Sequence, residues 1–182
     1  MPFTGSHEAM ISFDQAPIPG DIVCDVRPII TDVLNSFTEV TMSSSVNQSS
    51  AVGIFLQNMA SWNISAFIDS EATAENLRQP VFDEEGNRVF RDTYVYVIPP
   101  DTYAESYQPI IMNSLGEGGV NVVGEGGDIA VGDLIVTSST PGKGMKQADD
   151  IVRSYTVAKA REAVTFSSPT EEKMIACIYM CG

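Results

Sequence analysis

The sequence predicts a mainly β fold: a barrel- or sandwich-like domain of two related β lobes with a small α/β insertion. The apolar runs in the last third of the chain are short, rich in β-branched residues and bounded by Gly, Pro, Asp or Ser. Such runs are typical of strands joined by tight turns. The clearest examples are residues 132–139, 155–160 and 174–182, so the chain is expected to end in a strand.

An earlier segment follows the same plan. Gly20-Asp21-Ile22-Val23 resembles Gly132-Asp133-Leu134-Ile135-Val136, and residues 50–56 follow the first copy as residues 155–160 follow the second. Gly permits the turn, Asp accepts hydrogen bonds from turn amides, and the apolar run enters a core. Two copies predict a pseudo-symmetric barrel or two packed lobes. The alternative is a common turn-to-strand signal that recurs by chance.

The predicted organisation is one domain preceded by an arm. Residues 1–15 are expected to form an N-terminal arm and residues 16–182 a single β-rich domain. Within this domain we expect a first lobe at 16–58, an insertion at 60–112 and a second lobe at 113–182.

The insertion has local signals of its own. We expect a short helix at 70–77, a hairpin with arms at 80–82 and 88–90, and a strand at 94–98 that ends at a Pro-Pro pair. Further on, residues 115–128 contain two Gly-Glu-Gly-Gly tracts, which predict the turns of hairpins.

Charge and hydropathy limit the possible partners. The chain has 182 residues, 43% of them hydrophobic, a formal net charge of −14 and only ten Lys and Arg residues. It is long enough to bury a core. Binding to DNA, RNA or an anionic membrane through a basic surface is not expected, because such binding needs cationic side chains. We also expect no membrane span and no signal peptide.

The three cysteines are expected to be reduced and mostly buried. Cys177 and Cys181 lie four residues apart on a predicted strand, on one face but too distant to bridge. With a single His in the chain, no zinc site is expected.

Candidate catalytic and metal-binding groups are sparse. Ser6-His7-Glu8 places a hydroxyl, an imidazole and a carboxylate in sequence, but neighbours on an extended chain point in opposite directions. Asp149 and Asp150 are expected in a solvated turn and not in a metal site. We therefore predict no catalytic, cofactor-binding or metal-binding residues and no cofactor.

Aromatic residues indicate two possibilities for assembly. Tyr94, Tyr96, Tyr103 and Tyr107 cluster around a Pro-Pro pair and could form a subunit or capsid contact. The alternative is an ordinary half-exposed sheet face. The single Trp62 is poor support for a sugar-stacking platform.

The C-terminal third resembles the C-terminal region of virion proteins of tailed bacteriophages, particularly those that infect cyanobacteria and other marine bacteria. The matching motifs are Gly142-x-Gly144-Met145-Lys146-Gln147-x-Asp149-Asp150, Ser154-Tyr155-Thr156-Val157-Ala158-Lys159-Ala160-x-Glu162-Ala163-Val164 and Lys173-Met174-Ile175-Ala176-Cys177-x-Tyr179-x-Cys181-Gly182. Near the start, Phe3-Thr4-Gly5-x-His7 and the Gly20 motif resemble the opening of the same module.

This resemblance implies a non-enzymatic structural protein, a homo-oligomer expected to be a trimer, that contacts other virion proteins in the assembled particle. Capsid decoration and a tail fibre, collar or baseplate appendage remain open. We expect exposed strand edges to pair between subunits. A more distant similarity is to the self-cleaving intramolecular chaperone domains that trimerise phage fibres and spikes. Such domains follow a long fibre, whereas Phe3 closely follows Met1, so self-cleavage is the alternative and not the expectation.

Overall fold

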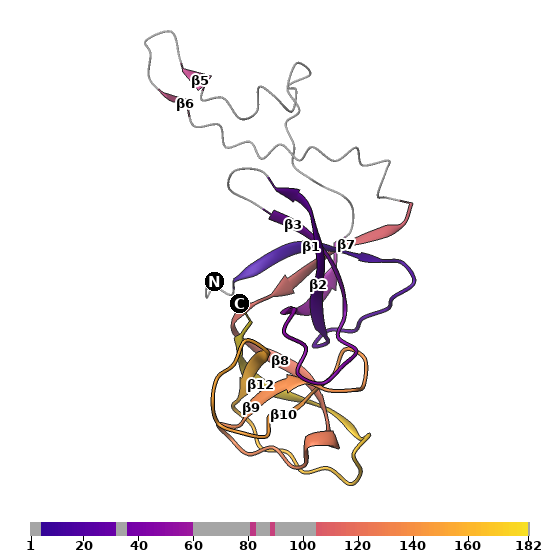
Figure 1. Ribbon diagram of the computed structural model, residues 1–182, viewed down its shortest axis with the longest axis vertical. Helices are drawn as coiled ribbons and strands as arrows, with labels where there is room; N and C mark the ends of the chain where they lie inside the picture. The colour runs from indigo at the N-terminus through magenta and orange to yellow at the C-terminus, as the bar shows by residue number, and fades with distance from the viewer. Residues whose placement is uncertain (1–4, 32–35, 60–80, 83–87, 90–104, 182) are drawn as a thin grey trace.

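The computed structural model describes residues 5–31, 36–59, 81–82, 88–89 and 105–181 (Figure 1). Within these residues the chain forms two closed β-barrels of five strands each, an isolated two-stranded hairpin and one short 3-10 helix. The predicted class, a mainly β fold of two related lobes, is confirmed.

The strands of each barrel are hydrogen-bonded in a fixed order. The first barrel has the order β1-β3-β2-β4-β7 and consists of β1 (Ser6–Ser12), β2 (Ile22–Thr31), β3 (Ser36–Met42), β4 (Ala51–Asn58) and β7 (Tyr107–Asn113). The second has the order β10-β8-β12-β11-β9 and consists of β8 (Leu115–Val123), β9 (Leu134–Thr137), β10 (Gly144–Lys146), β11 (Thr156–Ala160) and β12 (Glu172–Met180). The helix η2 (Gly124–Gly126) follows β8, and the hairpin pairs β5 (Val81–Phe82) with β6 (Arg88–Val89).

The two barrels share one topology. In the first, β1 runs parallel to β3, and every other pairing is antiparallel. In the second, β8 runs parallel to β10 and the remaining pairings are again antiparallel. Strands β1, β2, β3, β4 and β7 therefore correspond in chain order to β8, β9, β10, β11 and β12. The lobes predicted to be related are two copies of the same barrel.

Equivalent turns precede β2 and β9. Gly20 and Gly132 have positive φ angles of 99° and 96°, a conformation that Gly adopts without steric cost. The following carboxylates accept the same bond: Asp21 Oδ2 from the amide of Ile18 at 3.1 Å, and Asp133 Oδ2 from the amide of Ala130 at 2.8 Å.

The same backbone hydrogen bonds then join each turn to its neighbouring strand. In each turn the Gly amide donates to the carbonyl of one residue in the neighbouring strand. The amide of that same strand residue donates back to the carbonyl of the turn Asp. The bonds are Gly20 N to Phe55 O, Phe55 N to Asp21 O, Gly132 N to Ala160 O and Ala160 N to Asp133 O. Phe55 and Ala160 lie in the two segments that the sequence comparison aligned.

The boundaries of the first barrel differ from those expected. Residues 6–12, expected in an N-terminal arm, form β1, because Ala9, Met10 and Ile11 are fully buried. Residues 107–112, expected in the insertion, belong to β7, which closes the barrel by pairing with both β1 and β4.

The two Gly-Glu-Gly-Gly tracts have different structures. The first lies inside β8 and not at a turn, whereas the second forms η2 and the residue after it. Glycines fit this strand because the ring of Tyr179 lies where a side chain on Gly118 would be. The predicted hairpin is present as β5 and β6. The expected helix at 70–77 and the strand at 94–98 fall outside the described residues, as do Trp62, Tyr94, Tyr96 and Tyr103.

Closure of both sheets has a consequence for assembly. A closed barrel has no unpaired edge strand, so the expectation that lobe edges pair between subunits is wrong for these two barrels. Contacts with other chains through the barrels must therefore use their outer faces or loops.

The buried apolar side chains of the described residues form two cores. The core of the first barrel includes Val23, Phe55 and Ile110. The larger core of the second barrel also contains Ile22 and Ile54, which belong to β2 and β4 of the first barrel. Side chains from one barrel thus complete the core of the other.

Candidate functional site

Backbone and side-chain hydrogen bonds join the two barrels along a contact that we call the seam. Ile22 N donates to Gly142 O at 2.7 Å, and Gly142 N donates to Ser43 O at 2.8 Å. Thr137 Oγ1 accepts from Gln48 N and donates to Ser45 O, both at 2.8 Å. The seam therefore joins the turn before β2 and the loop after β3 to the second barrel.

Four polar side chains meet at the centre of the seam, and we call them the Asp21 cluster: Asp21, Asn121, Lys143 and Glu172. Lys143 Nζ lies 2.6 Å from Asp21 Oδ1, and the two side chains are only 8% and 4% exposed. Asn121 Nδ2 donates to the same oxygen at 2.8 Å. Glu172 Oε2 lies 3.5 Å from Lys143 Nζ on the solvent side, where its side chain is 53% exposed.

Local backbone geometry brings these groups together. Asp21 follows the turn glycine that precedes β2, and Lys143 precedes β10 directly after Gly142. Gly142 has a φ of 75°, and a Cβ atom there would lie 2.9 Å from Asp21 Cγ. Only glycine satisfies both constraints, because the positive φ strains other residues and the carboxyl group fills the space.

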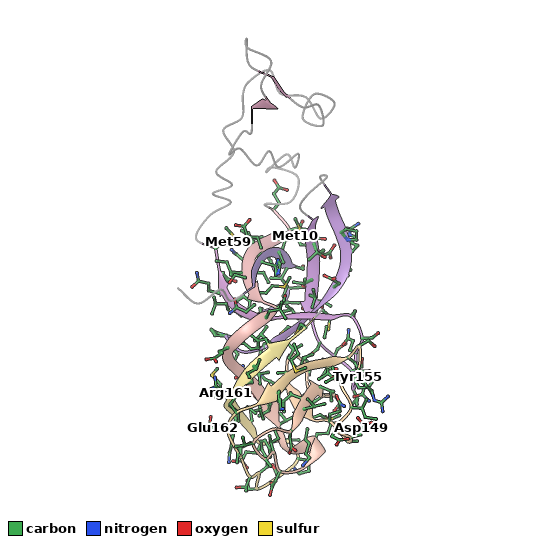
Figure 2. All side chains as sticks on the ribbon, turned by 90° about the vertical axis from the view of Figure 1, so that its left-hand side faces the viewer. Met10, Met59, Asp149, Tyr155, Arg161 and Glu162 are labelled. Carbon is green, nitrogen blue, oxygen red and sulfur yellow. The ribbon has the colours of Figure 1, made fainter. Side chains whose placement is uncertain are left out.

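A pocket of about 350 Å³ lies beside the seam. Its wall combines the β3–β4 loop of the first barrel with η2 and the segment after β10 of the second. The lining residues are Val46, Asn47, Glu125, Gly126, Met145, Lys146, Gln147, Ala148, Asp149 and Tyr155. Figure 2 shows Asp149 and Tyr155 together on this side of the second barrel, and Arg161 and Glu162 on the other.

Most polar groups of this pocket already have protein partners. The buried Gln147 donates to Asp149 and Ile151 and accepts from Thr156. Asp149 also binds the Arg153 guanidinium at 2.6 Å, and the hydrogen bonds from Arg153, Gln147 and the Ile151 amide lower the pKa of Asp149 to about 2. The pocket wall is thus held by internal bonds, which is the turn role expected for Asp149.

His7 and its neighbours do not form a catalytic arrangement. All three lie on β1, where alternate residues face opposite sides. Ser6 Oγ donates to Asn113 Oδ1 at 2.6 Å, and His7 is exposed at the position opposite Met112. Ser6 and His7 therefore do not converge.

The cysteines are buried thiols, as predicted. Cys24, Cys177 and Cys181 are all free and buried. Burial raises the pKa of Cys177 and of Cys181 to about 12 and that of Cys24 to about 11. Since the thiolate is the reactive form, these residues are unreactive at neutral pH.

The Asp21 cluster was missed from the sequence. Asp21 was interpreted as a turn residue, which is correct, but its two buried partners lie 100 and 122 residues away.

Searches against protein-family models, curated proteins and solved structures found no match. Within the described residues there is no group of three or more His, Cys, Asp or Glu side chains placed to hold a metal ion. No helix in that part of the chain is both long and apolar enough to cross a membrane.

Proposed function

We propose that this chain is a non-enzymatic structural protein of a bacteriophage particle, an oligomeric component of the particle surface. The observation that carries the proposal is the tandem duplication of a closed barrel, joined by a seam whose buried polar groups bind one another. A joined pair of barrels suits a part that must keep its shape in an assembly. The C-terminal motifs that resemble phage virion proteins support the viral context.

The outer face of β8 and β12 provides a surface for self-assembly. Leu115, Met174 and Ile178 point away from the core on these paired strands and are 53%, 55% and 40% exposed. We call them the apolar face. Glu117, in register with Ile178, is paired with Arg161 at 2.6 Å.

A second copy of this chain is the occupant that fits the apolar face. Two chains with a net charge of −14 each repel over most of their surfaces. Contact is most favourable where apolar area is buried and the nearby acid is already ion-paired. We propose a homotrimer that binds other virion proteins, with no nucleic acid or membrane partner, located in virions that assemble in the host cytoplasm.

The test is the solution mass of the intact protein by light scattering, together with denaturing mass spectrometry of the same sample. A trimer of uncut chains is the expected result. A monomer at high concentration would overturn the assembly proposal. A defined internal cut, abolished by a single Ser, Asp or Glu substitution, would instead favour the self-cleaving chaperone alternative.

A further inference from the structure

We propose that Asp21 and Lys143 form an intramolecular isopeptide bond that ties the two barrels together covalently, with Glu172 as the proton-transfer residue. The inference stands on the geometry of the Asp21 cluster and does not depend on the proposed function.

The reacting atoms are already in contact. Lys143 Nζ lies 2.6 Å from Asp21 Oδ1. Since a carbon–oxygen bond is about 1.2 Å long, Nζ is at most about 3.8 Å from the carboxyl carbon. This is close to the separation of about 3–3.5 Å from which bound groups react. Both residues precede strands, and backbone hydrogen bonds hold their main chains. Burial holds their side chains in contact, at 8% and 4% exposure, so little freedom opposes the approach.

Burial favours the neutral product of the reaction. A salt bridge removed from water carries a desolvation cost for both ions, and a neutral amide does not carry that cost. Transfer of one proton from the Lys143 ammonium to Asp21 Oδ1 across their hydrogen bond gives an amine and a carboxylic acid. Condensation of this pair then replaces two buried charges with one neutral amide.

The bond-forming step balances as a simple condensation. The Nζ lone pair attacks the Asp21 carboxyl carbon, and the Ile18 amide, 3.1 Å from Oδ2, stabilises the negative charge that develops on that oxygen. Glu172 takes one proton from Nζ and delivers it to the Oδ1 hydroxyl, which leaves as water. The products are the Lys143–Asp21 amide and one water molecule, so no oxidant or cofactor is needed.

Asn121 and Glu172 divide the supporting roles. Asn121 Nδ2 holds Oδ1 from the buried side at 2.8 Å and also donates to Pro19 O at 3.0 Å. Glu172 lies on the solvent side and is 53% exposed. Water can therefore leave past Glu172 while the acid and amine stay buried.

The second barrel contains an internal control. Asp133 occupies the turn position equivalent to Asp21 and is paired with Lys146 Nζ at 2.7 Å. Their side chains are 25% and 37% exposed, so solvent stabilises both ions and no condensation is expected. The distance between the lysine nitrogen and the carboxylate oxygen is nearly equal in the two pairs, 2.6 Å and 2.7 Å. The pairs therefore differ in burial and not in distance.

The experiment is intact-mass spectrometry of the denatured full chain after folding and prolonged incubation. The expected mass is lower than the sequence mass by one water molecule. A tryptic digest should yield one branched peptide that joins the Asp21 and Lys143 segments, with no cleavage after Lys143. Lys143→Arg should restore the full mass, and Lys146→Arg should leave the loss of water unchanged.

Glu172→Gln separates reaction from folding. This variant keeps both reacting residues and alters a half-exposed side chain, so its circular dichroism should match the parent, whereas the loss of water should be strongly slowed. A folded parent chain that keeps its full mass would overturn the proposal. Loss of ammonia in place of water would also overturn it, because the bond would then join Lys143 to Asn121.

Discussion

Gly118 lies beneath the ring of Tyr179, on the strand that pairs with the C-terminal strand. A side chain at Gly118 would overlap the Tyr179 hydroxyl and ring, and Tyr179 is 5% exposed and donates to Gly119 O at 2.8 Å. The aromatic ring thus fills the barrel interior at a point where its partner strand contributes only backbone.

Gly118→Ala is expected to destabilise the protein by about 1–3 kcal/mol, the usual cost of overpacking a core. Urea unfolding would measure the change. Gly119→Ala is the matched control, because a Cβ there meets the flexible end of the exposed Met174 side chain at 3.0 Å. Equal losses in the two variants would contradict the packing explanation.

The buried thiols predict how stability depends on alkaline pH. Burial raises the pKa of Cys177 and Cys181 to about 12, whereas thiols in an unfolded chain ionise at about 8.5. The raised pKa means that the stability from the neutral thiols is complete below the unfolded value and is lost as the pH rises toward 12.

The urea concentration at the unfolding midpoint should therefore fall steadily as the pH rises from about 8.5, the thiol pKa in the unfolded chain, to about 10.5. Cys177→Ala should flatten this decline and lower the midpoint at pH 7 through loss of packing. A slope identical to that of the parent would show that another group controls the alkaline transition.

At the scale of elements, the two Gly-Asp turns offer a comparison within one chain. Both carboxylates accept a turn amide, but Asp21 is also bonded to buried Lys143 and Asn121, whereas Asp133 is bonded to the partly exposed Lys146.

Asp133→Ala should cost about 1 kcal/mol, the value of a typical hydrogen bond. Measured against parent protein in which the Asp21–Lys143 amide has not yet formed, Asp21→Ala should cost about 3–5 kcal/mol, because it leaves a buried lysine without its counter-ion. Denaturant unfolding of both variants tests the difference. Similar costs would mean that the turn, and not the buried cluster, accounts for the contribution of Asp21.

Local signals made the strands with β-branched runs predictable, and the Gly-Asp repeat revealed the duplication. β1 was missed because its first half, Ser6-His7-Glu8, is polar and only Ala9 to Ile11 carry the buried signal. The parallel pairing of β1 with β3 and the Asp21 cluster depend on contacts far apart in sequence. No local pattern contains that information.

For the whole molecule, the apolar face leads to a prediction about assembly. Ile178→Glu should dissociate the proposed trimer at low micromolar concentration, because a desolvated, unpaired carboxylate would lie in the interface. Light scattering at several concentrations measures the change. Ile151→Glu is the control, since Ile151 is 57% exposed but lies in the loop after β10. A trimer unaffected by Ile178→Glu would place the interface elsewhere.

The shared topology also indicates where the fold can accept additional residues. In the first barrel residues 59–106 connect β4 to β7, whereas in the second barrel only residues 161–171 connect the equivalent β11 and β12. One copy of the fold thus accepts a long stretch of extra chain at this connection without a change in strand order. The same connection in the second barrel is therefore the natural place to graft a foreign peptide, and the double barrel becomes a candidate display scaffold.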